Sequence, residues 1–153
     1  MLRISKLTDY AIVVLSLMAR HDDRTFAAAE LADRSGIALP TVSKILKMLG
    51  KAGVVRSTRG ARGGYCLTSS AADISVASVI DALEGPIAIT ECGVAHDSCQ
   101  QAGSCHIRGN WNVINRAVRT ALEAVTLTDM VTPAPAPTDE HVIRIRPADL
   151  PTR

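Results

Sequence analysis

Hydrophobic and polar positions recur with helical spacing through the first third of the chain and predict three helices. The first, over about 9–20, is apolar around much of its circumference, and Thr8 is its expected N-cap. The second, over about 27–34, is closed by Gly36, a residue suited to the left-handed conformation at helix ends. The third opens at Pro40 and has apolar residues at i, i+3, i+4 and i+7, namely Val42, Ile45, Leu46 and Leu49.

The tight turn over 36–38 joins the second and third predicted helices into a helix-turn-helix. In this motif the second helix lies in the major groove of DNA, with its N-terminal residues at the base edges. The alternative is a generic helical hairpin. The outward polar residues that we expect at the DNA are Thr41, Ser43, Lys44 and Lys47.

The pattern after Gly53 changes to two short β-rich runs, over 54–58 and 65–68, around a loop of glycines and arginines. A hairpin attached to a helix-turn-helix is a wing. Arginine is favoured where a narrow minor groove concentrates negative potential, so Arg59 and Arg62 are candidate DNA contacts. A nucleotide-binding loop is the alternative, but these glycines lack the Gly-Lys-Ser/Thr ending of a P-loop.

The distribution of charge supports a polyanion partner more than the total does. The net charge is only +2, yet the segment 34–72 contains seven basic residues and no Asp or Glu. The rest of the chain has 10 basic and 15 acidic residues, a balance of −5. An ordinary solvated surface usually mixes both signs, so we interpret the basic segment as a phosphate footprint.

The second half predicts two further helices. One, over 73–83, is stopped by Gly85 and Pro86 and is expected to pack in the core. The other, over about 107–127, has an apolar stripe that we expect to pack against its own copy in a homodimer, matching a palindromic operator. The alternative is a helix folded back on its own domain. The stripe comprises Trp111, Val113, Ile114, Ala117, Val118, Ala121, Leu122 and Val125.

The predicted fold is therefore mainly α with a small β-wing. We expect a winged helix-turn-helix DNA-binding domain over 1–84, a long dimerisation helix over 107–131 and a disordered tail over 132–153. The loop between the domain and the helix, over 85–106, contains three cysteines and is expected to bind a metal cluster. The tail carries five of the seven prolines. Neither a membrane-spanning apolar run nor a signal peptide is evident, so we expect a cytoplasmic protein with no membrane partner.

Three of the four cysteines, Cys92, Cys99 and Cys105, lie close together in a polar stretch. In a reducing compartment, clustered cysteines are more often metal ligands or redox thiols than disulfides. Their gaps of six and five residues, with no CxxC pair, favour an iron-sulfur cluster over structural zinc. Metal-free redox thiols and unliganded cysteines are the alternatives. Cys66, in the predicted wing, is expected to be a small buried residue.

Several motifs together resemble the winged-helix iron-sulfur regulators, the family that includes IscR and NsrR. The resemblance covers about residues 1–131. It rests on the segments 6–11, 36–37 and 59–65 and on the register of the three cysteines. The stretches 84–87, 91–92 and 110–115 are most similar to the subgroup that regulates the Suf iron-sulfur assembly operon.

The resemblance implies a homodimeric repressor of iron-sulfur assembly genes, with Ser43, Lys44 and Arg59 at the DNA. It also implies that the three cysteines hold a two-iron or four-iron cluster. Members with two irons carry a histidine three residues after the last cysteine, where this chain has Arg108. Members with four irons use an acidic residue from the partner chain, a position that Asp9 matches. Asp9 is thus the candidate fourth ligand, and His106 is the alternative.

Two other functions remain open. One is a regulator that senses oxidants or nitric oxide through metal-free thiols. The other is an iron-sulfur electron or cluster carrier, which would leave the basic segment unexplained. We do not expect an enzyme, because the sequence offers no nucleophile-base motif or cofactor loop.

Overall fold

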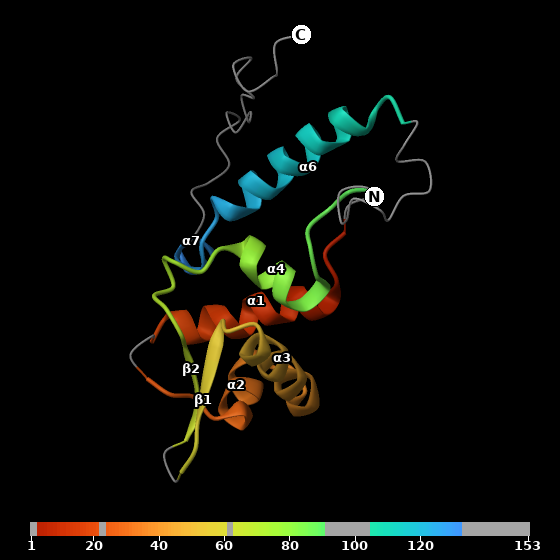
Figure 1. Cartoon of the computed structure of the whole chain (residues 1–153). Helices are drawn as coiled ribbons and strands as arrows, with labels where there is room; N and C mark the ends of the chain where they lie inside the picture. The colour runs from red at the N-terminus through yellow and green to blue at the C-terminus, as the bar shows by residue number, and fades with distance from the viewer. Residues whose placement is uncertain (1–2, 22–23, 61–62, 91–104, 133–153) are drawn as a thin grey trace.

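The computed structural model describes residues 3–21, 24–60, 63–90 and 105–132, and these residues form helices with one small sheet (Figure 1). The mainly helical fold with a β-wing is as predicted. In the described residues, no helix is long and apolar enough to cross a membrane. The predicted tail from residue 133 onward lies outside them. The elements are α1 (Lys6–Ala19), α2 (Ala28–Ser35), α3 (Leu39–Lys51), β1 (Val55–Thr58), β2 (Gly64–Leu67), α4 (Val76–Glu84), α6 (Arg108–Glu123) and α7 (Leu127–Val131).

Helices α2 and α3 form the predicted helix-turn-helix. Helix α2 ends at Gly36, whose φ of +69° is the left-handed conformation expected there. Helix α3 has Pro40 in its first turn, and its four predicted apolar residues are fully buried. Each such side chain contributes about 1.5–3 kcal/mol to folding through burial. The helical spacing of the sequence thus fixes which face of α3 is turned outward.

Strands β1 and β2 pair antiparallel to form the predicted wing, with Val55 opposite Leu67 and Thr58 opposite Gly64. The wing also pairs with Phe26, a contact that the sequence did not indicate. The amide of Phe26 donates to the Tyr65 carbonyl and the Tyr65 amide donates to the Phe26 carbonyl, both at 2.8 Å. Because Phe26 is fully buried, this bridge fastens the wing to the helical core.

Two predicted helix starts are wrong. Helix α1 begins earlier, because Ser5 is the N-cap and its side chain accepts from the Thr8 amide at 3.2 Å. Thr8 is buried inside the first turn. Helix α4 begins at Val76 rather than near Asp73, because the Ser75 side chain accepts from the Ser78 amide at 3.1 Å.

The segment predicted as one helix over 107–131 contains two. Helix α6 ends at Glu123, and Thr126 starts α7 with a capping box: its side chain accepts from the Asp129 amide, and the Asp129 carboxylate accepts from the Thr126 amide. Leu127 then enters the core and is fully buried, with its amide donating to the Ile74 carbonyl at 2.9 Å. The end of α6 is therefore attached to the winged domain.

Helix α6 lies on the far side of α4 from α1 and α3 (Figure 1). None of its residues is buried. Its apolar stripe is half-buried or exposed, and Ile114 is 43% exposed. Within the described part of one chain, this stripe remains largely uncovered.

Candidate nucleic-acid interface and metal site

The outward face of α3 carries the predicted DNA contacts. Ser43, Lys44 and Lys47 are exposed, and Thr41 is half-buried. The first turn of α3 contains no acidic residue, and its last turn carries Lys51. Because the opposite face is buried in the core, the backbone positions from which these side chains extend are fixed relative to one another.

The wing holds Arg59 exposed at the end of β1, while Arg62 lies outside the described residues. Its turn is tight: a side chain at Gly63 would place Cβ 2.4 Å from the Thr58 carbonyl oxygen. Glycine therefore lets the backbone close here without a clash. Arg56, the basic residue of β1, donates from Nε to the Sγ of Cys66 at 3.1 Å.

The basic segment is less uniform than its sequence indicates. Arg34 forms an ion pair with Glu30 at 3.4 Å and lies over the Phe26 ring, 5.8 Å from its centroid. Arg24 contacts the same carboxylate. Arg34 therefore has a role in joining α2 to the core, and the expected phosphate footprint rests on α3 and the wing.

The structure describes only part of the predicted metal site. Cys92 and Cys99 lie outside the described residues. Cys105 is a free, half-buried thiol just before α6, and His106 is exposed. No group of three or more potential metal ligands occurs among the residues that the structure describes.

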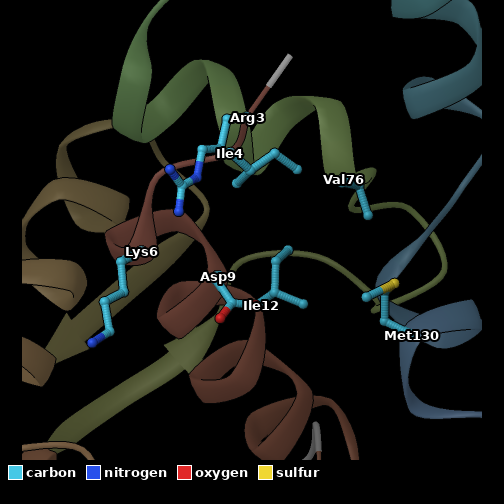
Figure 2. Close-up of a pocket in the computed structure, with 7 residues that line it drawn as sticks. All are labelled: Arg3, Ile4, Lys6, Asp9, Ile12, Val76 and Met130. Atoms are coloured by element: carbon cyan, nitrogen blue, oxygen red, sulfur yellow. The ribbon is translucent and has the colours of Figure 1, made fainter. Parts of the chain in front are cut away.

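Asp9, the candidate ligand from a partner chain, is exposed in the first turn of α1. It lines an open hollow of about 600 Å³, where it lies between Lys6 and Ile12 along α1 (Figure 2). Arg3 and Met130 line the same hollow. The hollow brings two basic groups near this carboxylate, and it leaves the carboxylate open to solvent or to another chain.

Residues 85–90, here called the anchor segment, lead into the cysteine stretch and are attached to two helices. Asp81 of α4 accepts from the Ile87 amide at 3.1 Å and from Arg119 of α6 at 2.8 Å. Asn115 of α6 accepts from the Ile89 amide at 2.8 Å. The backbone of the anchor segment is therefore held between α4 and α6.

Glu84 attaches the beginning of the anchor segment to α1. One of its carboxylate oxygens accepts from the Thr8 hydroxyl at 2.5 Å and from the Ser5 amide at 2.9 Å. The hydrogen bonds from Thr8 and then Ser5 hold the pKa of Glu84 below its ordinary value. Sequence reasoning assigned no contact to Glu84, Asp81 or Asn115. Glu84 and Asn115 lie in the stretches 84–87 and 110–115 that resemble the Suf subgroup, whereas Asp81 is only a polar residue within an apolar helical pattern.

Comparison with known proteins shows the family to which the whole described fold corresponds. The Rrf2 family, described as an iron-dependent transcriptional regulator, matches residues 4–133. Protein rrf2 of Nitratidesulfovibrio vulgaris is 32% identical over 119 residues, which cover 78% of this chain and 79% of that protein. The HTH-type transcriptional regulator IscR of Vibrio atlanticus is 31% identical over 123 residues, covering 80% of this chain and 70% of that one.

Solved structures show the same fold. CymR, the global cysteine regulator of B. subtilis, superposes with a TM-score of 0.67 at 31% identity, covering 86% of this chain and 97% of CymR. IscR of T. potens superposes with a TM-score of 0.63 at 27% identity, covering 85% and 86% of the two chains. The helix-turn-helix, the wing and the extent of the family match lead to one conclusion. The chain belongs to the Rrf2 family of transcriptional regulators.

Proposed function

We propose that this regulator senses an iron-sulfur cluster and represses iron-sulfur assembly genes of the Suf type, acting in the cytoplasm as a homodimer on a palindromic operator. One observation supports the proposal most. The anchor segment, which leads to Cys92, is hydrogen-bonded to both α4 and α6. A change in the cysteine loop therefore has a physical route to the helix that we expect to form the dimer.

The described donor atoms fit such a cluster. Cys105 is not in a disulfide and is half-buried, so its sulfur can serve as a ligand in a partly enclosed site. Together with Cys92 and Cys99 it would supply three soft ligands, and the exposed Asp9 would be available to the cysteines of a second chain. Oxidation, nitric oxide or iron scarcity would remove such a cluster, and this loss would be the signal.

The residues of this chain then relate the loop to the DNA reader. Asn115 and Asp81 hold the anchor segment, and Arg119 joins Asp81 to α6. At its other end, α6 is attached to the winged domain through the buried Leu127. Ordering of the loop would therefore bias the angle of α6, and with it the spacing of two recognition helices. This is a coupling free energy between two sites.

A metal-free thiol sensor is the second candidate, favoured by the 31% identity to CymR over most of the chain. It needs a reactive cysteine, and the described free thiols are Cys66 and Cys105. Cys66 is buried in the wing, so Cys105 is the better placed of the two. An electron carrier gains no support from a family of transcriptional regulators.

Anaerobic purification tests the proposal. We expect a coloured protein with stoichiometric iron and sulfide, and loss of both in Cys92→Ser, Cys99→Ser and Cys105→Ser. The matched control is Cys66→Ala, which removes a thiol outside the predicted ligand set and should retain the cluster. A colourless, iron-free wild-type protein would rule out the cluster. If this iron-free protein binds the operator and thiol oxidation reverses the binding, the regulator is a metal-free thiol sensor.

A further inference from the structure

Leu39 is an apolar side chain on the surface expected to meet DNA. It is the first residue of α3 and is 45% exposed. Of the large hydrophobic side chains that are exposed in the described residues, the others lie near the N-terminus, on α1, or at and beyond α6. They are Ile4, Val13, Ile107, Ile114, Val125 and Met130. Leu39 therefore stands apart from the face expected to form the dimer.

No structural role in starting α3 accounts for Leu39. Ala38 is the N-cap, so a hydrophobic staple would join the residue before it, Ile37, to the fourth helical residue, Val42. Ile37 does pack against the core, and Val42 is fully buried. The helix therefore has its apolar entry contact without Leu39.

The position of Leu39 on α3 relates it to the predicted DNA contacts. Residues four apart lie one above another on a helix, so Leu39, Ser43 and Lys47 form one row. All three are exposed. In a helix-turn-helix the N-terminal end of this row is closest to the base edges, while lysines farther along can reach phosphates.

We propose that Leu39 is a specificity-determining residue that contacts the C5-methyl group of a thymine in the major groove. This rests on the DNA-reading part of the proposed function and is independent of the cluster. Leucine has no hydrogen-bonding group, and the thymine methyl is the apolar group that base edges present in the major groove. The contact therefore selects thymine over cytosine or uracil at one position of each half-site.

Replacing thymine by deoxyuracil tests this contact, because it removes only the methyl group. An operator is first selected from random DNA by the wild-type protein, in whichever state binds more tightly. Each symmetric thymine pair is then replaced, and Kd is measured at fixed salt. At one thymine pair, we expect the replacement to raise the wild-type Kd roughly four-fold for each methyl lost. This factor corresponds to the burial free energy of one methyl-sized group.

The variant Leu39→Ala should bind the thymine and uracil operators equally, and Leu39→Met, which keeps an apolar side chain, should retain the difference. Lys47→Ala is the control: it should weaken binding to both operators and preserve their ratio. If the wild type and Leu39→Ala respond alike to every replacement, the assignment is wrong while DNA reading stands. If the wild type selects no sequence at all, both the Leu39 assignment and the proposed DNA reading are wrong.

Discussion

Asn115 of α6 accepts a hydrogen bond from the Ile89 amide at 2.8 Å, three residues before Cys92. A separate route runs from the Ile87 amide through Asp81 to Arg119 of α6. Among the described residues, Asn115 bonds directly to the anchor segment, and its Nδ2 also donates to the Thr90 hydroxyl at 3.5 Å. Removal of the Asn115 side chain should separate sensing from DNA binding without unfolding the protein.

The first prediction concerns this contact. In Asn115→Ala, the ratio of operator affinities between the cluster-loaded and cluster-free proteins should shrink by about five-fold, because a hydrogen bond of about 1 kcal/mol no longer connects loop and helix. Titration of labelled operator under anaerobic conditions measures it. Asn112→Ala, at an exposed position of the same helix, is the control and should keep the wild-type ratio. An unchanged ratio in Asn115→Ala would show that coupling does not pass through this side chain.

A second prediction follows from Glu84. Its folded-state pKa lies below the ordinary value of 4.5, so its contribution to stability is complete above that value and is lost as the pH falls through the lowered folded-state pKa. Glu84→Gln should lower the free energy of unfolding by about 1 kcal/mol at neutral pH, because the carboxylate accepts from both Ser5 and Thr8. The difference from wild type should fade in acid.

Urea unfolding at several pH values checks this behaviour. Glu123→Gln serves as the control, because within the described part of the chain Glu123 forms an exposed i,i+4 ion pair with Arg119, and such pairs contribute little. A wild-type to Glu84→Gln difference that persists unchanged well below pH 4 would show that the ionised carboxylate is not its source.

The third prediction separates positioning from base reading. Lys47→Ala should weaken binding to specific and random DNA alike and reduce the salt slope of the dimer by about 1.8, the value for two phosphate contacts. Ser43→Ala and Arg59→Ala should instead change the preference between sites. Arg116→Ala removes the same charge from α6, on the other side of α4 from α3, and should leave the slope as it is (Figure 1). Equal losses on all DNA for Lys47, Ser43 and Arg59 variants would contradict this division.

A fourth prediction concerns the apolar stripe of α6. Ile114→Glu should yield a monomer, because a charge would be buried against the second copy without a partner. Operator affinity should fall by about a hundred-fold once the second reader is lost. Asn112→Glu places the same charge at an exposed position on nearly the opposite side of α6 and should remain dimeric. Sedimentation equilibrium distinguishes the two. A dimeric Ile114→Glu would mean that another surface joins the copies.

The parts of the fold that depend on local pattern were predictable, and those that depend on distant contacts were not. The face of α3 follows from the spacing of Val42, Ile45 and Leu49, and the end of α2 follows from Gly36. The N-cap of α1 does not, because Ser5 and Thr8 are both capping types and Glu84, far along the chain, engages the Thr8 hydroxyl. The bridge at Phe26 likewise joins residues remote in sequence.

The sequence contains a signal for the break between α6 and α7, but the apolar periodicity across it favoured one continuous helix. Thr126 and Asp129 have capping-box spacing, yet the apolar residues on either side continue the helical stripe. For the site, the sequence predicted outward residues on α3 and a buried Cys66. Ser43, Lys44 and Lys47 are exposed and Cys66 is buried, whereas Thr41 is half-buried. The attachments of the anchor segment could not be predicted, because they join α4, α6 and α1 through single side chains.

The affinity of one operator for the cluster-loaded and cluster-free proteins, measured without oxygen at one salt concentration, tests the central claim most directly. We predict dissociation constants that differ by at least about five-fold, the lower end of typical coupling between two sites. Equal dissociation constants for the two forms would contradict the proposal that this regulator senses a cluster.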